Sequence, residues 1–280
     1  MKTIKLNNGV EMPMVGYGVW QISPEACEHC VSEALSVGYR SIDTAQAYNN
    51  EEGVGNAIRK SGIPREELFV TTKVWISNSG DEKAMRSIDE SLRKLQTDYI
   101  DLLLVHQPFG DYYGTYRAMQ QAYEKGKARA IGLSNFYDAR FLDLAENMEV
   151  KPAVIQLETH VFSQQVKMRE LAKAYGTRVM AWSPLARGMN GLFSNEKLKA
   201  IGDKYHKDIA QICLKFLTDE GIIVIPQSTR KERMASNLSI DDFELTNDER
   251  ETIRQMDGGK PLAADFNDPA FAKALLEYRM

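Results

Sequence analysis

The chain has 280 residues, and its 35 lysines and arginines against 39 aspartates and glutamates leave a formal net charge of −4. Charges of both signs are interspersed, which argues against a nucleic-acid partner, and no apolar run approaches the roughly 20 residues of a membrane-spanning helix. The first residues do not resemble a signal peptide and three cysteines are too few for a disulfide framework, so we expect a cytoplasmic protein forming a single domain over residues 1–280.

The N-terminal segment predicts a β-hairpin. Apolar residues alternate with polar ones on both sides of Asn8-Gly9, which is the strongest short signal for a hairpin turn. A first strand follows at residues 15–18. Its Gly-x-Gly pattern lacks the third glycine of a dinucleotide-binding loop, because position 21 is Gln21, and this excludes a Rossmann interpretation.

Cys27 and Cys30 form a C-x-x-C motif, a pattern that can serve redox chemistry or metal binding. The preceding Ser23-Pro24 is typical of a helix start, which would place both thiols on the first turns of a helix. A zinc site needs two further ligands, and the sequence has no second C-x-x-C motif and no H-x3-H motif. We therefore expect the pair to be structural.

From residue 24 onward, helical and strand patterns alternate. The helical patterns cover about residues 24–37, 51–60, 81–95, 113–125, 137–147, 165–175, 196–205, 209–218 and 230–238, and Asp268-Pro269 starts a further one. Strand patterns cover residues 15–18, 41–43, 68–74, 100–105, 128–133, 153–157, 178–182 and 222–225. Several strands are apolar throughout, as parallel strands covered on both faces should be. The alternation is typical of a closed (β/α)8 barrel but leaves an open sheet possible.

Four side chains suited to catalysis lie at or just after strand ends. Asp43 and Lys73 end two strands, Tyr48 lies in the loop after the first of these, and His106 follows a third strand. The steps from Asp43 to Lys73 and from Lys73 to His106 are 30 and 33 residues, each about one strand-plus-helix unit. Each residue alone could be structural. Because parallel strands end on one rim, we expect the acid, the phenol, the ammonium and the imidazole to share one pocket.

Eight short motifs then occur in the order of one family. The sequence resembles the aldo-keto reductase family, in its bacterial type, through Asp43-x4-Tyr48, Thr72-Lys73-Val74-Trp75, Val105-His106-Gln107-Pro108, Gly132-x-Ser134-Asn135, Gln156-x-Glu158, Ser183-Pro184-Leu185, Ile225-Pro226-x-Ser228 and Arg233-x3-Asn237. This resemblance implies a (β/α)8 TIM barrel whose N-terminal β-hairpin closes the bottom, and a C-terminal tail that borders the substrate pocket. It also implies that Tyr48 is the general acid in carbonyl reduction, that Asp43 and Lys73 tune it, and that His106 orients the carbonyl.

The resemblance further implies an NADPH site without a metal, with NADH as a weaker alternative. The implied contacts are Ser134, Asn135 and Gln156 for the nicotinamide carboxamide, Trp182 for the nicotinamide ring, Ser183, Leu185 and Gly188 for the pyrophosphate, Ser228, Thr229 and Arg233 for the 2′-phosphate, and Asn237 for the adenine. Gln227 stands where many members carry lysine. Because a cation that would face the 2′-phosphate is then missing, we expect a weakened preference for NADPH.

The predicted substrate pocket is shallow and open. Gln107 replaces a tryptophan that is frequent in the family, and Trp20, Trp75, Phe109 and Phe136 are the expected lining residues. Such a pocket would suit small or varied aldehydes, and we expect a monomer with no nucleic-acid or membrane partner. Two other functions remain open at this point. One is a non-enzymatic subunit that senses nicotinamide nucleotides, and the other is a lyase that forms a Schiff base on Lys73.

Overall fold

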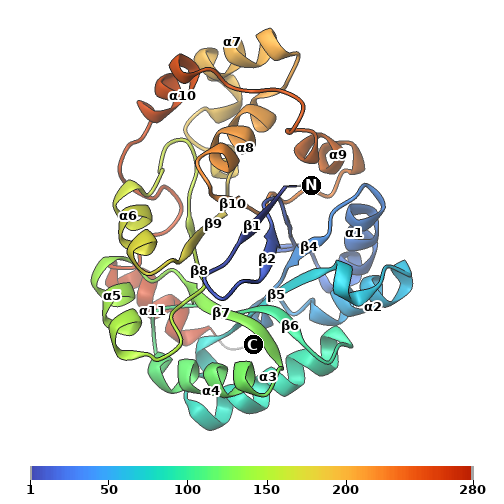
Figure 1. The fold of residues 1–280 in the computed structure, drawn as a ribbon, viewed down its shortest axis with the longest axis vertical. Coiled ribbons are helices and arrows are strands. Elements are labelled where there is room, and N and C mark those ends of the chain that lie inside the picture. The colour runs from blue at the N-terminus through green and yellow to red at the C-terminus, as the bar shows by residue number, and fades with distance from the viewer. Residues whose placement is uncertain (1, 279–280) are drawn as a thin grey trace.

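The structure is a computed structural model that describes residues 2–278. It shows a barrel of eight parallel strands. Its strands are β3 (Tyr17–Gly18), β4 (Ser41–Asp43), β5 (Phe69–Val74), β6 (Ile100–Val105), β7 (Ala128–Ser134), β8 (Val154–Glu158), β9 (Arg178–Trp182) and β10 (Ile223–Val224). Each strand pairs in parallel with the next along the chain, and the sheet curls on itself (Figure 1). The barrel closes where the Gly16 N–H donates to the Val224 carbonyl at 2.8 Å and Val15 bridges Val224. The predicted (β/α)8 barrel is thus confirmed.

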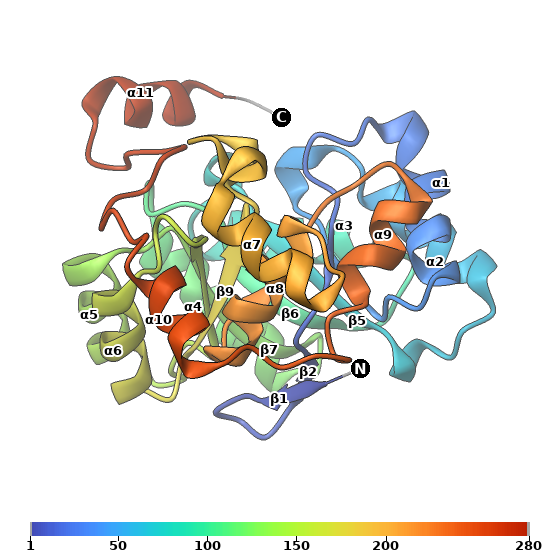
Figure 2. The ribbon, with the colours of Figure 1, turned by 90° about the horizontal axis from the view of Figure 1, so that it is seen from above.

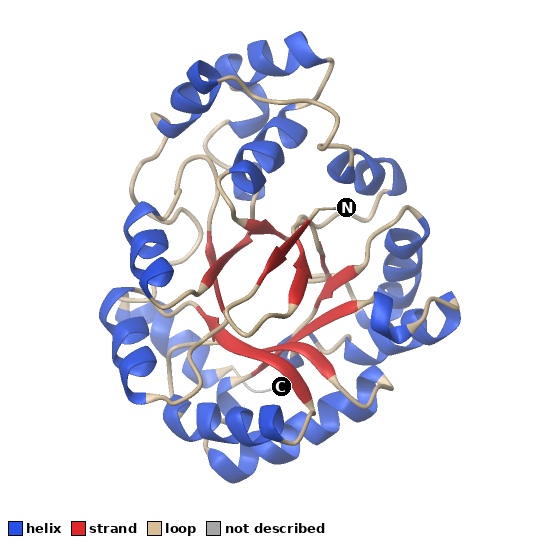
Figure 3. Cartoon of the chain, viewed as in Figure 1, coloured by secondary structure: helices blue, strands red, loops and turns tan. Residues whose placement is uncertain are grey.

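Helices form a ring around the strands (Figure 3). They are α1 (Pro24–Ser36), α2 (Glu51–Ser61), α3 (Asp81–Leu95), α4 (Tyr112–Glu124), α5 (Asp138–Asn147), α6 (Val166–Ala174), α7 (Glu196–Tyr205), α8 (Ile209–Asp219), α9 (Lys231–Leu238), α10 (Asn247–Arg254) and α11 (Pro269–Glu277). Because helices cover the outer face and side chains fill the interior, every residue of β5 and β6 is buried. Within residues 2–278, none of the helices combines the length and the apolar composition that crossing a membrane would require.

Several helices begin with a side-chain cap. The Ser23 hydroxyl accepts from the Ala26 N–H at the start of α1, next to the proline at its first position. The sequence patterns missed α10, although Thr246 and Glu249 form a complete capping box there. That helix has only one buried residue, Ile253, so its apolar periodicity is too weak to indicate it.

The N-terminal hairpin closes one end of the barrel. Strands β1 (Thr3–Lys5) and β2 (Glu11–Pro13) pair antiparallel across the Asn8-Gly9 turn. Leu6 and Met12 are buried and pack with the interior residues Phe69 and Leu102. Figure 2 shows the hairpin at one end of the molecule and α11 at the opposite end. The strands direct their C-terminal ends toward the α11 end, so the side chains suited to catalysis lie there.

Candidate active site

The four residues predicted to be catalytic lie together at the rim. Tyr48 ends a short 3-10 turn (Gln46–Tyr48) that follows β4, and His106 is the first residue after β6. The Lys73 ammonium donates to the Asp43 carboxylate at 2.6 Å and lies 3.4 Å from the Tyr48 hydroxyl. The Tyr48 and His106 rings meet edge to face with their centroids 5.6 Å apart. A cavity of about 760 Å³ opens above these residues, and Asp43, Tyr48 and His106 line it.

Strand register explains why Lys73 reaches Asp43. Asp43 of β4 is paired with Thr71 of β5, and Lys73 is two residues further along β5, on the same face. The side chain of Lys73 is completely buried. Burial acts to lower the pKa of Lys73, but the Asp43 carboxylate and the Tyr48 phenol outweigh it and hold that pKa above its ordinary value. Lys73 is therefore a buried cation beside the Tyr48 hydroxyl.

Tyr48 and His106 are both affected by the low polarity of the site. Burial raises the pKa of the Tyr48 phenol, and the Lys73 ammonium opposes that rise without cancelling it. Burial and the Lys73 charge lower the pKa of His106 well below its usual value, so its imidazole is neutral at physiological pH. Its Nδ1 is buried and has no hydrogen-bond partner among the described residues. A neutral imidazole and a protonated phenol thus face the same cavity.

Three of the predicted nicotinamide contacts lie next to these residues. Ser134 of β7 is paired in register with Gln156 of β8, and the Gln156 side chain donates to Asp43 at 2.8 Å. Asn135 donates to the His106 carbonyl at 3.1 Å and accepts from the Trp182 indole at 2.9 Å. These strands approach closely at Gly132, where a Cβ atom would come within 2.3 Å of the Val154 carbonyl.

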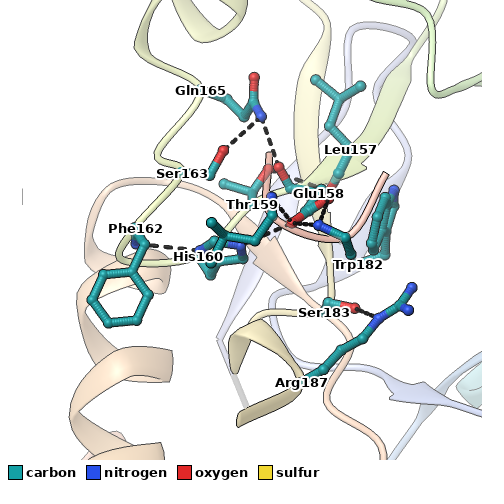
Figure 4. Close-up of polar contacts among 12 residues, drawn as sticks. Leu157, Glu158, Thr159, His160, Phe162, Ser163, Gln165, Trp182, Ser183 and Arg187 are labelled. Atoms are coloured by element: carbon teal, nitrogen blue, oxygen red, sulfur yellow. Dashed lines mark hydrogen bonds and ion pairs between the residues drawn. The ribbon is translucent and has the colours of Figure 1, made fainter. Parts of the chain in front are cut away.

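The segment after β9 contains a residue that the sequence analysis did not identify. Arg187 lines the cavity, and its guanidinium lies 4.3 Å from the Trp20 ring centroid and 5.5 Å from that of Trp182. Its Nε donates to the Ser183 hydroxyl at 3.2 Å (Figure 4). Ser183 and Arg187 both have left-handed backbone conformations, with φ of 50° and 51°. Ser183 and Leu185 also line the cavity, whereas Gly188 is not among the described residues that line it.

The predicted adenosine contacts lie outside the cavity. Ser228 is buried just before α9, where its hydroxyl accepts from the Arg230 N–H at 3.0 Å. Thr229 and Arg233 are exposed, and Asn237 is buried on α9. Gln227 directly precedes Ser228, is exposed, and lines the cavity. The cavity therefore leads from the catalytic residues toward the start of α9.

Two of the four predicted pocket aromatics do not line the cavity. Trp20 and Trp75 are part of its wall, but Phe109 and Phe136 are not among the described residues that form it. Phe136 is fully buried and packs edge-on against Tyr112 of α4, 5.1 Å between centroids, because the chain turns outward after β7. The Phe109 ring instead lies 5.4 Å from the guanidinium of Arg140 on α5.

Other aromatic side chains complete the wall. They come from the C-terminal tail, defined here as residues 257–278, and are Phe266, Phe271 and Tyr278. The family resemblance implied that this tail borders the substrate pocket, and in the structure its helix α11 lies at the rim end of the barrel (Figure 2).

The C-x-x-C motif lies away from the cavity. Cys27 and Cys30 are buried in the first turns of α1, and both are free thiols. Burial raises the pKa of the Cys27 thiol to about 12, which keeps it protonated and unreactive at neutral pH. Within residues 2–278, no three His, Cys, Asp or Glu side chains are grouped so that they could hold a metal ion.

Comparisons with known proteins agree with this geometry. The sequence model of the Aldo/keto reductase family matches residues 12–257. The chain is 44% identical to the glyoxal reductase of Bacillus subtilis over 254 residues, which are 90% of this chain and 91% of that protein. It is 40% identical to the methylglyoxal reductase DkgA of Escherichia coli over 265 residues, 94% of this chain and 96% of that protein. A Bombyx mori aldo-keto reductase solved in complex with NADP is 35% identical, with a TM-score of 0.89 over 95% of this chain and 97% of that one.

Proposed function

The chain belongs to the aldo/keto reductase family, and we propose that it reduces small aldehydes and ketones to alcohols with NADPH, using Tyr48 as the general acid. The observation that carries this proposal is the Lys73 ammonium, which lies within hydrogen-bonding distance of both Asp43 and Tyr48 at the base of the cavity. The family is one of NAD(P)H-dependent oxidoreductases, so the chemistry of the site and the family agree.

The residues around the cavity fit a nicotinamide dinucleotide. Trp182 presents a half-buried ring to the cavity, the Asn135 amide just after β7 accepts from its indole, and the Gln156 amide of β8 lines the same cavity. When bound, the dinucleotide would supply the hydride that adds to the carbonyl carbon. Arg187 lies at the same wall, where its charge suits the phosphates of such a ligand.

Tyr48 and His106 would then act on the carbonyl oxygen. Negative charge grows on that oxygen as the carbon is attacked, and a positioned donor that supplies a proton commonly contributes about 10²–10⁴-fold in rate. The buried Lys73 ammonium stabilises the phenolate that Tyr48 leaves behind, against the cost of its burial. Neutral His106 can donate a second hydrogen bond to the oxygen and fix which carbonyl face is presented.

Substrate size and cofactor choice follow from the walls. A cavity of about 760 Å³ between Trp20, Trp75 and the tail aromatics suits small carbonyl compounds, and the two bacterial relatives are named as reductases of glyoxal and methylglyoxal. The exposed Thr229 and Arg233 near the start of α9 support recognition of a 2′-phosphate. Because Gln227 is neutral, we propose a preference for NADPH that is weaker than in relatives with lysine there.

The experiment that tests this function is the Tyr48→Phe variant, assayed by NADPH consumption with glyoxal, methylglyoxal and larger aldehydes. We expect kcat to fall at least ~10²-fold, with the dissociation constant for NADPH unchanged, because the ring stays and only the proton donor is lost. Tyr113→Phe on α4 is a matched control that should keep full activity. Near-normal turnover by Tyr48→Phe would reject Tyr48 as the acid. Tight NADPH binding by the wild type with no reduction of any carbonyl would favour a nucleotide-sensing role.

A further inference from the structure

We propose that Glu158 and His160 are positioning residues that hold the C-terminal tail against the rim and thereby set one wall of the substrate cavity. Glu158 is the last residue of β8, and the tail begins about a hundred residues further along the chain. The inference rests on the reduction proposed above, because it assigns residues that place the substrate for that reaction.

The side chain of Glu158 forms hydrogen bonds with the backbone of the tail. It is fully buried, and its carboxylate accepts hydrogen bonds from the Leu262 N–H at 2.6 Å and from the Ala263 N–H at 2.9 Å. Burial acts to raise the pKa of Glu158, but the hydrogen bonds from His160 and from these two N–H groups outweigh it and lower that pKa. The carboxylate is therefore ionised at neutral pH, and its bonds to the backbone are charge-assisted.

His160 fixes the orientation of that carboxylate. Its Nδ1 accepts from the Phe162 N–H at 3.2 Å, so Nε2 is the ring nitrogen that carries a proton. Nε2 lies 3.1 Å from a Glu158 oxygen and donates to it. Both ring nitrogens thus have hydrogen-bond partners, although the His160 side chain is completely buried. Glu158 therefore contacts His160 on one side and the backbone of the tail on the other.

The loop after β8 docks the tail at further points. The Phe162 carbonyl accepts from the Gly258 N–H at 2.9 Å, and the Gln164 N–H donates to the Asp257 carboxylate at 3.1 Å. At its other end the tail is attached more weakly, where the Trp75 indole donates to the Tyr278 carbonyl at 3.3 Å. The tail is therefore held at two anchors, one at Glu158 and one at Tyr278, and the Glu158 anchor is the stronger.

Between the two anchors, residues 264–277 have one buried side chain, Phe266, which stacks on Tyr137 with 5.9 Å between ring centroids. None of the residues of α11, all of which the structure describes, is buried, and Leu276 is 42% exposed. Nevertheless Phe271 and Leu275 of α11 line the cavity, as do Ala263 and Phe266 next to the Glu158 anchor. A segment with so little buried surface opens readily unless specific hydrogen bonds hold it. The position of this wall thus depends on Glu158, although Glu158 itself does not line the cavity.

The test compares Glu158→Gln with the wild type. A carboxamide keeps one acceptor oxygen, but its NH2 group replaces the second oxygen, which accepts from the Ala263 N–H at 3.1 Å. That bond is lost, and the bonds that remain no longer have a charged acceptor. We expect the amide hydrogens of residues 257–268 to exchange faster, and KM for methylglyoxal to rise about five- to thirty-fold. The change in kcat and in the NADPH dissociation constant should stay within about two-fold. Glu51→Gln is the matched control, because Glu51 is also buried but accepts from the Thr72 hydroxyl and does not contact the tail.

A second variant tests the anchor from the tail side. Ala263→Pro removes one of the N–H groups that donate hydrogen bonds to Glu158, while the carboxylate stays intact. Its effect on KM and that of Glu158→Gln should be strongly non-additive in the double variant, because both changes break the same contact. This variant also gives the same readouts if Glu158→Gln does not fold.

Three results would overturn the inference. They are unchanged amide exchange in the tail, additive effects on KM, and a joint loss of kcat, KM and cofactor affinity that would indicate a general structural role. Amide exchange does not depend on activity. Faster exchange in a protein that reduces no carbonyl would therefore leave the anchor standing and reject the proposed function instead.

Discussion

Replacing Lys73 with methionine should destabilise the protein and disable Tyr48 by two separable mechanisms. Lys73 is fully buried and Asp43 is 2% exposed, with 2.6 Å between the ammonium and the carboxylate. Breaking a buried ion pair from one side costs about 3–5 kcal/mol, because the remaining charge stays buried without a partner. Replacing both partners with neutral groups is often much less costly. The double variant Asp43→Asn/Lys73→Met should therefore be more stable than Lys73→Met alone.

Activity should behave differently from stability. The Lys73 ammonium lies 3.4 Å from the Tyr48 hydroxyl and opposes the effect of burial on the phenol. Without it, Tyr48 becomes a weaker acid, and we expect kcat to fall about 10²-fold or more. Asp43→Asn restores no positive charge near Tyr48, so the double variant should recover stability but not kcat.

The assay measures urea unfolding and NADPH consumption for the wild type, the two single variants and the double variant. Lys215→Met is the matched control, because Lys215 is 1% exposed and pairs with Asp219 at 2.8 Å on α8, outside the cavity wall. It should lose stability but keep kcat. Strictly additive stability changes at Asp43 and Lys73, or a double variant that regains kcat, would refute this account of the site.

Two further predictions concern the cofactor and pH. Gln227→Lys places a cation at an exposed position, where solvent screens it, so NADPH should bind about two- to five-fold more tightly. NADH should bind as before, and an equal gain for both cofactors in a fluorescence titration would count against a 2′-phosphate site. For His106, the folded pKa lies below the unfolded one, so the unfolded state takes up the proton first and stability is lost as pH falls below the unfolded pKa of about 6.5. Between pH 7 and 5.5 this should cost the wild type up to about 1.2 kcal/mol of unfolding free energy that His106→Gln does not lose. Identical pH dependences would show that His106 is not held neutral by the fold.

The sequence predicted those parts of the site that depend on strand register. Asp43, Lys73 and His106 lie at or just after the ends of neighbouring strands, and parallel pairing alone brings such residues to one rim. Phe136 could not be placed in this way. It lies two residues beyond Ser134, the end of β7, and the left-handed Asn135, with φ of 68°, directs the following chain into the helix layer. Strand, helix and turn patterns in the sequence do not encode that change of direction.

The direction of the pKa shift at Tyr48 could not be predicted from the sequence either. A neighbouring lysine predicts a lowered phenol pKa, but in the fold burial outweighs that lysine and the pKa is raised. Desolvation depends on how many atoms from distant segments surround the hydroxyl, and this quantity has no local signature. Arg187 was missed for a related reason, since its contacts with Trp20 and Trp182 arise only when loops from two parts of the barrel meet.

The catalytic residues and the substrate wall therefore differ in how they are held. Lys73 is fixed by neighbouring strands and by a fully buried ion pair, so its geometry is as rigid as the barrel itself. The tail aromatics are positioned across long sequence distances, through backbone N–H groups that meet Glu158. Side chains on α11 can then vary without changing any hydrogen bond of the anchor, because the anchor uses only main-chain donors of the tail. This arrangement lets the substrate wall change while the proton-donating group stays in place.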